Sequence, residues 1–227
     1  MSRDTQFADA AKNAAVETIS SLPQRNFLVE LTGCDGPMTL LYRHLFAGMW
    51  LGWALYWWAL SRNVKPSVRT ESTSSRLLHI VPLMLAVALL WLPRVPLPIL
   101  GERFVPPAAW PFWVGAALTL AGMLFSVWAR VHLGSNWSGV VTVKEDHELI
   151  QSGPYGIVRH PIYTGLLLAF AGSALARGEW RGILAVVIVL WAFWRKLRTE
   201  ERWMRERFGS AYQSYSERVP ALVPFVL

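Results

Sequence analysis

The chain has 227 residues, of which 53% are hydrophobic and 16% charged, and its formal net charge is +7 at pH 7. Soluble domains usually contain about 25% charged residues, so this composition excludes a disordered chain and disfavours an ordinary water-soluble domain. The 13 tryptophans are typical of the aromatic belts of membrane proteins, and the single cysteine, Cys34, excludes an intrachain disulfide and a multi-cysteine zinc site.

Residues 1–43 are predicted to form a polar N-terminal arm. They carry acidic side chains at Asp4, Asp9 and Glu17 and contain no continuous apolar segment. A secretory signal peptide needs such a segment, so we expect that this arm is not a cleaved signal.

Five segments without any Asp, Glu, Lys or Arg follow the arm, and each predicts a transmembrane helix. They are residues 44–61, 77–93, 104–129, 160–176 and 182–194. A charged residue at the bilayer centre costs about 2.5 to 3.5 kcal/mol, and a spanning helix needs about 17 to 25 residues. The first four segments meet this length. The fifth is short, so it either crosses with Arg181 and Arg195 extending to the interfaces or forms a re-entrant hairpin.

The predicted fold class is therefore all-α: an integral membrane bundle of about five transmembrane helices with a cytoplasmic interfacial helix at the C-terminus. Residues 44–129 would hold the first three helices. Residues 130–227 would form a second domain with a loop, a helical hairpin (160–194) and the C-terminal helix. Loops on one side carry 14 Lys and Arg against 8 on the other, which places the C-terminus in the cytoplasm.

The fourth and fifth predicted helices are joined by only five residues, 177–181, so they must form an antiparallel hairpin. His160 lies 19 residues before Glu179, the midpoint of this connection, and Glu200 lies 21 residues after it. Because each helical residue rises about 1.5 Å, both side chains should lie at the same depth, at the cytoplasmic mouth. The groups that converge there are basic, acidic and phenolic: Arg159, His160, Tyr163, Arg198, Glu200 and Glu201.

Each of these side chains also has an ordinary structural explanation. Pro161 favours the first turn of a helix, so His160 could simply precede that start. Arg159 and Arg198 could extend to the interface, and Glu and Arg residues four apart could form surface pairs. Taken together, however, groups of both charges can bind a small zwitterion, whose carboxylate prefers Arg or His and whose ammonium prefers Glu.

From Gly134 onward, the chain resembles the isoprenylcysteine carboxyl methyltransferases, integral membrane enzymes that use S-adenosylmethionine. The matching motifs are Gly134-Ser135-Asn136-Trp137, the segment His147 to Tyr155, Arg159-His160-Pro161-Ile162-Tyr163-Thr164-Gly165, Arg198-Thr199-Glu200-Glu201, Phe208-Gly209, Tyr212, Tyr215 and Arg218-Val219-Pro220. Their order and spacing make the resemblance specific, whereas one such motif alone would not. It covers roughly the last two-fifths of the chain.

The resemblance implies that a lipophilic acceptor enters from the bilayer and that S-adenosylmethionine becomes S-adenosylhomocysteine. It also implies a set of cofactor-binding residues, namely His147, Leu149, Gly153, Tyr155, Arg159, His160, Pro161, Tyr163, Glu200 and Glu201. We expect Arg159 and His160 to hold the methionyl carboxylate and Glu201 to hold the amino or ribose hydroxyl groups. One departure concerns the acceptor, because the eukaryotic pattern has an arginine where this chain has Ser126.

The nature of the acceptor determines which catalytic groups are needed. A carboxylate is already ionised at neutral pH and requires no base, and Asn136 and Arg198 would then orient it as catalytic residues. An amine or thiol acceptor, on a lipid or a small hydrophobic molecule, would need a base. Glu200, Glu201 and His147 are the candidates for that role.

Two other functions remain open at this stage. A sterol-type membrane reductase that uses NADPH can carry a similar Arg-His-Pro-x-Tyr motif, and a scaffold could bind anionic lipid through its basic C-terminal tail. Positive charge is spread over membrane loops, which disfavours nucleic-acid binding, and no histidine pair has metal-ligand spacing. Gly115, Gly122 and Ala129 predict a close helix contact, either within the bundle or in a homodimer.

Overall fold

The computed structural model describes residues 37–61, 67–70, 72–92, 97–106, 108–134, 137, 142–144 and 149–224. The predicted N-terminal arm therefore lies outside the described residues as far as residue 36. The chain divides into two units, Met1–Leu45 and Phe46–Leu227. The described part of the first unit is the beginning of helix α3 (Pro37–Leu60). The fold and the site presented below belong to the second unit.

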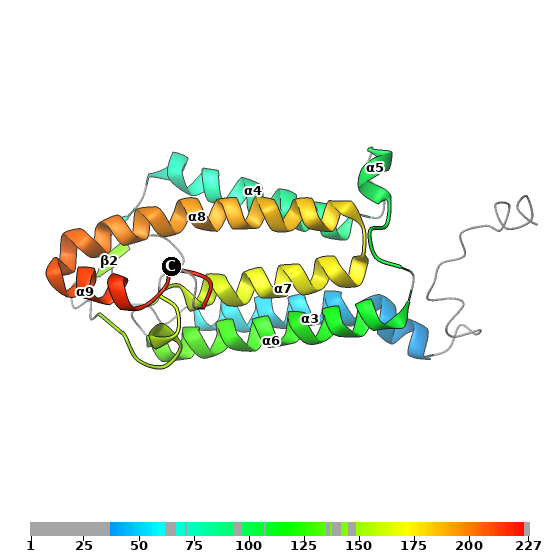
Figure 1. Cartoon of the computed structure of the whole chain (residues 1–227), viewed down its shortest axis with the longest axis horizontal. Helices are drawn as coiled ribbons and strands as arrows, with labels where there is room; N and C mark the ends of the chain where they lie inside the picture. Colours follow the sequence, from blue (N-terminus) through cyan, green and yellow to red (C-terminus); the bar gives the residue numbers. More distant parts are fainter. Residues whose placement is uncertain are drawn as a thin grey trace, which may run out of the picture. The chain divides into compact units, whose positions relative to one another are not determined.

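Five long helices, the first of which begins in the first unit, make up most of the described part of the second unit (Figure 1). They are α3, α4 (Thr73–Trp91), α6 (Ala109–Leu133), α7 (Pro161–Arg177) and α8 (Trp180–Phe208). Each of them overlaps one of the five apolar segments predicted to be helical. The shorter elements are α5 (Pro98–Gly101), the 3-10 turn η2 (Gly153–Gly156) and α9 (Ser210–Arg218). The prediction of a mainly helical fold is confirmed.

A small antiparallel sheet corrects the strictly all-α prediction. Strand β1 (Ser67–Thr70) pairs with strand β2 (Thr142–Lys144), with an irregular register between Ser67 and Arg69. The two strands come from the loops that follow α3 and α6. Threonine and valine favour extended backbone, which explains why the loop after α6 can supply a strand. In Figure 1, β2 is drawn at the end of the helices where α8 finishes.

Helices α6 and α7 pack with their backbones in direct contact. Gly115 and Gly122 on α6 lie opposite Gly172 and Gly165 on α7, and a Cβ atom at any of the four would overlap the other helix. Small residues seven apart permit this close approach. The predicted glycine contact therefore forms within the chain, where α7 occupies this face of α6.

Two indole hydrogen bonds attach α3 to the α6–α7 pair. The Nε1 of Trp50 donates to the Oγ of Ser173 at 3.1 Å, and the Nε1 of Trp53 donates to the Oγ of Ser126 at 3.0 Å. Buried indole N–H groups need an acceptor, and the two serines supply one each. Ser126, where the eukaryotic pattern has an arginine, thus has a structural partner on α3.

A short arginine-rich connection joins α7 to α8. Gly178 ends α7 in the left-handed conformation (φ 70°), which an L side chain rarely adopts. Glu179 accepts hydrogen bonds from Arg181 at 2.5 Å and from Arg177 at 3.4 Å. Arg177 also donates to the carbonyl of Leu90, near the end of α4, where the last carbonyls lack helical partners. The connection therefore fixes the hairpin and closes the end of α4 as well.

Helix α8 runs without interruption for 29 residues, a length of about 44 Å. The alternative of a re-entrant turn within residues 182–194 is therefore wrong. The first half of α8 is apolar, and its second half carries the charged sequence that contains Glu200 and Glu201.

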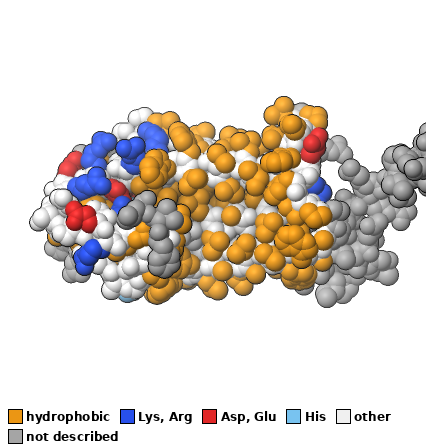
Figure 2. Space-filling view, in the orientation of Figure 1, with side chains coloured by type: hydrophobic (Ala, Val, Ile, Leu, Met, Phe, Trp, Pro, Cys, Tyr) orange, Lys and Arg blue, Asp and Glu red, His pale blue; other side chains and the backbone are white. Residues whose placement is uncertain are grey.

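Apolar side chains cover the middle of the helices on the face shown in Figure 2, whereas Lys, Arg, Asp and Glu gather over the end of α8 and α9. Exposed large apolar residues follow the outer faces of α4 and α6, including Val81, Met84, Leu120 and Leu124. Among the described residues, α4 and α6 are long and apolar enough to cross a membrane. The count of five crossings stays a prediction.

Candidate functional site

The site lies where α7 begins and the second half of α8 passes it. Pro161 occupies the first position of α7, where its missing N–H costs no hydrogen bond, and His160 immediately precedes it. Glu200 and Glu201 lie on α8, beyond its apolar half. The antiparallel course of the two helices brings these residues to the same level, as the hairpin geometry predicts.

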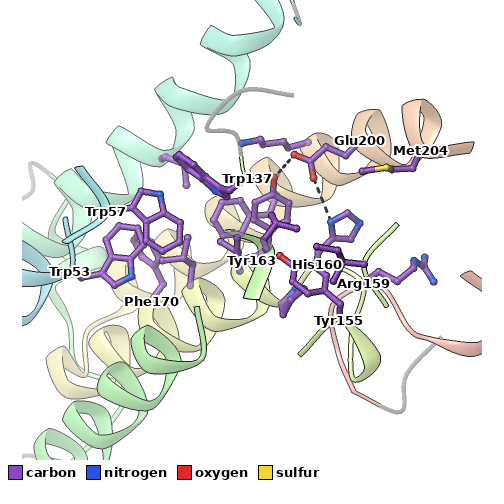
Figure 3. A pocket seen from close by; sticks show the side chains of 18 of the residues that line it. Trp53, Trp57, Trp137, Tyr155, Arg159, His160, Tyr163, Phe170, Glu200 and Met204 are labelled. Carbon is purple, nitrogen blue, oxygen red and sulfur yellow. Dashed lines mark hydrogen bonds and ion pairs between the residues drawn. The ribbon is translucent and has the colours of Figure 1, made fainter. Parts of the chain in front are cut away.

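Two glutamates, one histidine, one arginine and one tyrosine form a connected polar cluster. Arg159 donates from Nε and Nη2 to Glu201 Oε1 at 2.9 and 2.7 Å. The His160 ring lies between the two carboxylates, with Nε2 3.4 Å from Glu201 Oε1 and Nδ1 3.5 Å from Glu200 Oε2. Tyr163 donates to Glu200 Oε1 at 2.5 Å. Figure 3 shows Glu200 between His160 and Tyr163.

These contacts fix the charges of the cluster. Burial alone raises the pKa of Glu201, but hydrogen bonds from His160 and Arg159 outweigh it and lower that pKa to about 2. Burial acts on Glu200 in the same sense, and its interactions with His160, Lys196 and Tyr163 lower its pKa. Burial alone lowers the pKa of His160, but the two glutamates raise it above 6.5. Near neutral pH both carboxylates are ionised, and the imidazole is protonated more than a free histidine.

Four members of the cluster, Arg159, His160, Tyr163 and Glu200, line a cavity of about 700 Å³. This volume lies within the range of about 300 to 1,000 Å³ that is usual for small-molecule sites. The polar residues of its lining are Tyr155, Arg159, His160, Tyr163, Lys196, Glu200, Arg207, Tyr212 and Tyr215, and Figure 3 shows Arg159, His160 and Glu200 together at one end. Its aromatic and aliphatic residues include Trp50, Trp53, Trp57, Leu83, Val87, Trp91, Leu166, Phe170 and Phe193, and Figure 3 shows Trp53, Trp57 and Phe170 at the opposite end. A ligand or pair of ligands in this cavity would therefore meet charge at one end and hydrocarbon at the other.

Trp137 lies between the two ends of the cavity (Figure 3). The guanidinium of Arg130 lies 4.3 Å from its ring centroid, and the ring of Trp57 meets it edge-on with a centroid separation of 5.7 Å. Arg130 is almost fully buried, and it donates to the carbonyls of Gly134 at 2.8 Å and Leu60 at 3.0 Å. A cation over an aromatic face stabilises the ring in place. Arg130 thus fixes Trp137 at the junction.

The η2 turn positions Tyr155 at the polar end. Gly153 has φ 59°, and a Cβ atom there would lie 2.8 Å from the ring of His132. That ring lies 2.9 Å from the Oγ of Ser152 and is stacked on Tyr155. Tyr215 donates to the backbone carbonyl of Tyr155 at 2.6 Å. Burial raises the pKa of the Tyr155 phenol well above its usual value, so this side chain stays neutral.

The structure brings most of the predicted site residues to this cavity. Those in its lining are Leu149, Tyr155, Arg159, His160, Pro161, Tyr163 and Glu200. Glu201 lies beside it, bonded to Arg159. Gly153 shapes η2 and is not in the lining. Asn136 and His147 lie outside the described residues, so their predicted roles are not tested.

Arg198 is not where its predicted role requires it. Its side chain is exposed, and its guanidinium lies 6.0 Å from the ring centroid of Trp194, outside the cavity lining. Lys196 lines the cavity instead, with Nζ 5.5 Å from the ring centroid of Tyr163. The periodicity of α8 was the signal for this face, since the lining residues of that helix repeat at helical spacing: Phe193, Lys196, Glu200, Trp203, Met204 and Arg207.

The part of the chain that carries the site is similar to a known protein family. The profile of the family described as phospholipid methyltransferase matches residues 110–211. This match covers α6, η2, α7, α8 and the start of α9, the elements that carry the polar cluster. The polar cluster on α7 and α8 therefore lies within the region that is similar to this family.

Curated proteins of known activity are also similar to this chain. Over 129 residues, the chain is 29% identical to protein-S-isoprenylcysteine O-methyltransferase B of Arabidopsis thaliana, which covers 54% of this chain and 66% of that protein. It is 34% identical over 101 residues to protein-S-isoprenylcysteine O-methyltransferase of Schizosaccharomyces pombe, covering 43% of each chain. The matches thus span between two-fifths and about two-thirds of these relatives. The resemblance to the isoprenylcysteine methyltransferases, predicted from the motifs, is confirmed.

Among solved structures, that of the eukaryotic intramembrane Ras methyltransferase ICMT (isoprenylcysteine carboxyl methyltransferase) matches with a TM-score of 0.49 and 23% sequence identity. The match covers 70% of this chain and 55% of that one.

Proposed function

We propose that the protein is a membrane methyltransferase that transfers a methyl group from S-adenosylmethionine to a lipophilic acceptor, most favourably a carboxylate such as that of a prenylcysteine-like molecule. The observation that carries this proposal is a cavity that has charged residues at one end and apolar residues at the other. A polar methyl donor and a lipid-soluble acceptor need such complementary surroundings within reach of each other.

The residues at the charged end fit the proposed methyl donor. Its amino acid part is a zwitterion, and its adenine is flat and aromatic. Glu200 offers a carboxylate to the ammonium, His160 and Arg207 offer cationic groups to the carboxylate, and the rings of Tyr155 and Trp203 offer flat surfaces. Arg159 and Glu201 were expected to hold the donor directly, but they bind each other, so we assign them a supporting position.

The chemistry of the transfer places modest demands on the protein. S-adenosylmethionine, when bound, supplies a methyl group on a positively charged sulfur. The protein must hold the acceptor in line with that methyl group and exclude water, and the aromatic lining around Trp137 and Tyr163 serves both purposes. Lys196, close to Tyr163, provides positive charge near the junction, which favours an anionic acceptor.

The charge state of the glutamates favours a carboxylate acceptor over an amine or a thiol. A base that removes a proton near neutral pH works best with a pKa near 7. The pKa of Glu200 is lowered, and that of Glu201 is about 2. Both are therefore weak bases, whereas a carboxylate acceptor needs none. We therefore rank N- or O-methylation of a lipid, which would require the acceptor to lose a proton, below methylation of a carboxylate.

The proposed placement in the membrane is multi-pass, with the charged end of the cavity and the C-terminus in the cytoplasm. The excess of Lys and Arg on that side supports this orientation. The apolar surface of the central helices and the charged surface over α8 and α9 in Figure 2 have the distribution that such a placement requires.

A direct assay tests the proposal. The purified full chain is incubated with S-adenosylmethionine labelled in its methyl group, with a prenylcysteine analogue in one reaction and a total lipid extract in the other. We expect label in the prenylcysteine analogue and strong loss of it in the Glu200→Gln variant, while Arg202→Lys, an exposed change on the same helix, retains activity. Label in the extract alone would move the acceptor to another lipid.

A ligand-protection experiment separates the methyltransferase from the reductase and the scaffold. S-adenosylhomocysteine should raise the melting temperature of the detergent-solubilised chain, because a ligand that binds only the folded state stabilises it. Protection by NADPH instead would favour the sterol-type reductase. Protection by neither compound in a folded sample would favour a scaffold.

A further inference from the structure

We propose that Arg159 is a positioning residue that holds the C-terminal segment Val219–Leu222, here called the strap, against the charged end of the cavity, and that it is not a direct ligand of the methyl donor. The binding assay for this inference rests on the proposed function, whereas the hydrogen bonds that hold the strap do not depend on it.

The guanidinium of Arg159 is fully engaged with the protein. Nε and Nη2 donate to Glu201, while Nη1 donates to the backbone carbonyl of Ser216 at 2.8 Å and to that of Val219. All three nitrogen atoms therefore have protein acceptors. Two of those acceptors are carbonyls at the end of α9 and the start of the strap. This arrangement joins α8, α9 and the strap through one side chain.

The main chain at the start of α7 holds the strap in register. The N–H of Arg159 donates to the carbonyl of Pro220 at 2.8 Å, and the N–H of His160 donates to the carbonyl of Ala221 at 3.0 Å. One turn later, Thr164 donates from Oγ1 to the carbonyl of Leu222 at 2.6 Å. The N–H groups at the start of a helix have no acceptor within the helix, and the carbonyls of the strap are the acceptors here.

The strap secures α9, which contributes two tyrosines to the cavity. Tyr212 and Tyr215 are both buried and both line the charged end. Helix α9 follows α8 directly after Gly209 and leads into the strap, so it is anchored at both ends. Release of the strap would free α9 and expose the charged end to water.

The test compares two variants that loosen the strap from different sides. Arg159→Lys keeps the positive charge, but the lysine ammonium lacks the forked guanidinium group that binds Glu201 and the two carbonyls at the same time. Thr164→Val replaces the hydroxyl with a methyl group of similar size and leaves the charged cluster intact. Thr164 is outside the cavity lining. Arg202→Lys, an exposed Arg-to-Lys change on α8, is the matched control.

Two measurements are made on the full chain in detergent. The first is hydrogen exchange of peptides that contain α9 and the strap. The second is the affinity for S-adenosylhomocysteine and for 5′-methylthioadenosine, which has the same nucleoside but lacks the amino acid part. A residue that binds the donor carboxylate affects only the first ligand, whereas a residue that shapes the site affects both.

We expect faster exchange of α9 and the strap in Arg159→Lys and Thr164→Val. Both ligands should bind more weakly by the same factor, roughly three- to tenfold, which corresponds to losing about one hydrogen bond. Selective loss of S-adenosylhomocysteine affinity in Arg159→Lys, with strap exchange unchanged, would overturn the inference and make Arg159 a direct ligand. If the wild type bound neither nucleoside, the proposed function would fail, and hydrogen exchange alone would then decide whether Arg159 holds the strap.

Discussion

The Glu201 carboxylate contacts three basic side chains, two of which, His160 and Arg159, lower its pKa. Arg159 donates twice to Oε1, His160 lies 3.4 Å from the same oxygen, and Arg205 donates to Oε2 at 3.3 Å. Removing one partner of a buried ion pair leaves an uncompensated charge and typically costs about 3 to 5 kcal/mol. The stability of the site at the scale of single residues therefore depends on pH.

The melting temperature in detergent should be highest in mildly acidic solution. The pKa of Glu201 falls from 4.5 to about 2 on folding, so its stabilising contribution is present above pH 4.5 and is lost as the pH falls toward 2. The pKa of His160 is raised above 6.5, so its contribution is present below 6.5 and is lost as the pH rises through the folded value. Calorimetry across the acidic to alkaline range measures this profile.

His160→Gln is the control for the alkaline side of that profile. The variant lacks the titrating imidazole, so its melting temperature should fall less as the pH rises above 6.5, while the decline in strong acid remains. An alkaline decline equal to that of the wild type would show that another group is responsible.

At the scale of secondary-structure elements, the contact of α6 with α7 leaves no room for larger side chains at its glycines. Glycines at four positions let the two backbones meet, and this contact sets the position of α7, whose first turn carries the polar cluster. Interiors packed this closely respond to even one added methyl group.

Gly122→Ala should destabilise the protein by about 1 to 3 kcal/mol, because the added Cβ overlaps Gly165 and Ala169 on α7. Gly48→Ala, in α3, is the matched control, since no atom lies within 4 Å of the added Cβ and alanine favours a helix by about 1 kcal/mol over glycine. Denaturant unfolding in mixed micelles measures both. Equal effects of the two substitutions would contradict direct backbone contact.

The sequence predicts the long helices well and the side-chain partners less well. Gaps between charged residues locate α3, α4, α6, α7 and α8, because the cost of burying charge in a membrane is large. The antiparallel hairpin that follows from these gaps correctly predicts that His160 and Glu200 lie together. The prediction that Arg198 joins them is not met, because Arg198 lies two residues from both Lys196 and Glu200 and hence on the other side of α8.

Other features of the site leave no signature in the side chains. The strap is held through backbone carbonyls, so neither Pro220 nor Ala221 reveals its role by residue type. Strand β1 is short and polar, and only its pairing with β2 defines it. The mutual pairing of Arg159 with Glu201 depends on the distance between two helices, which motif spacing does not provide.

At the scale of the whole molecule, the distribution of charge predicts an orientation in the membrane. Glu102 lies in the connection between α5 and α6, and Gln213 lies on α9, and both side chains are exposed. The proposed orientation puts the first outside the cytoplasm and the second inside it.

Cysteine labelling on intact cells tests this orientation. In a Cys34→Ser background, Glu102→Cys should react with a membrane-impermeant maleimide, and Gln213→Cys should react only after the membrane is opened. Reaction of Gln213→Cys before lysis, with Glu102→Cys protected, would reverse the proposed orientation. Equal reaction of both would place the two positions on the same side.

The opposite character of the two ends of the cavity has a consequence for product departure. Methylation of a carboxylate abolishes its negative charge, so the ester partitions into lipid more strongly than the acid did. The spent nucleoside keeps its ammonium and carboxylate groups and partitions into water. Each product would thus leave through the end that matches its solubility, so the catalytic cycle would not require the tightly packed α6–α7 pair to separate.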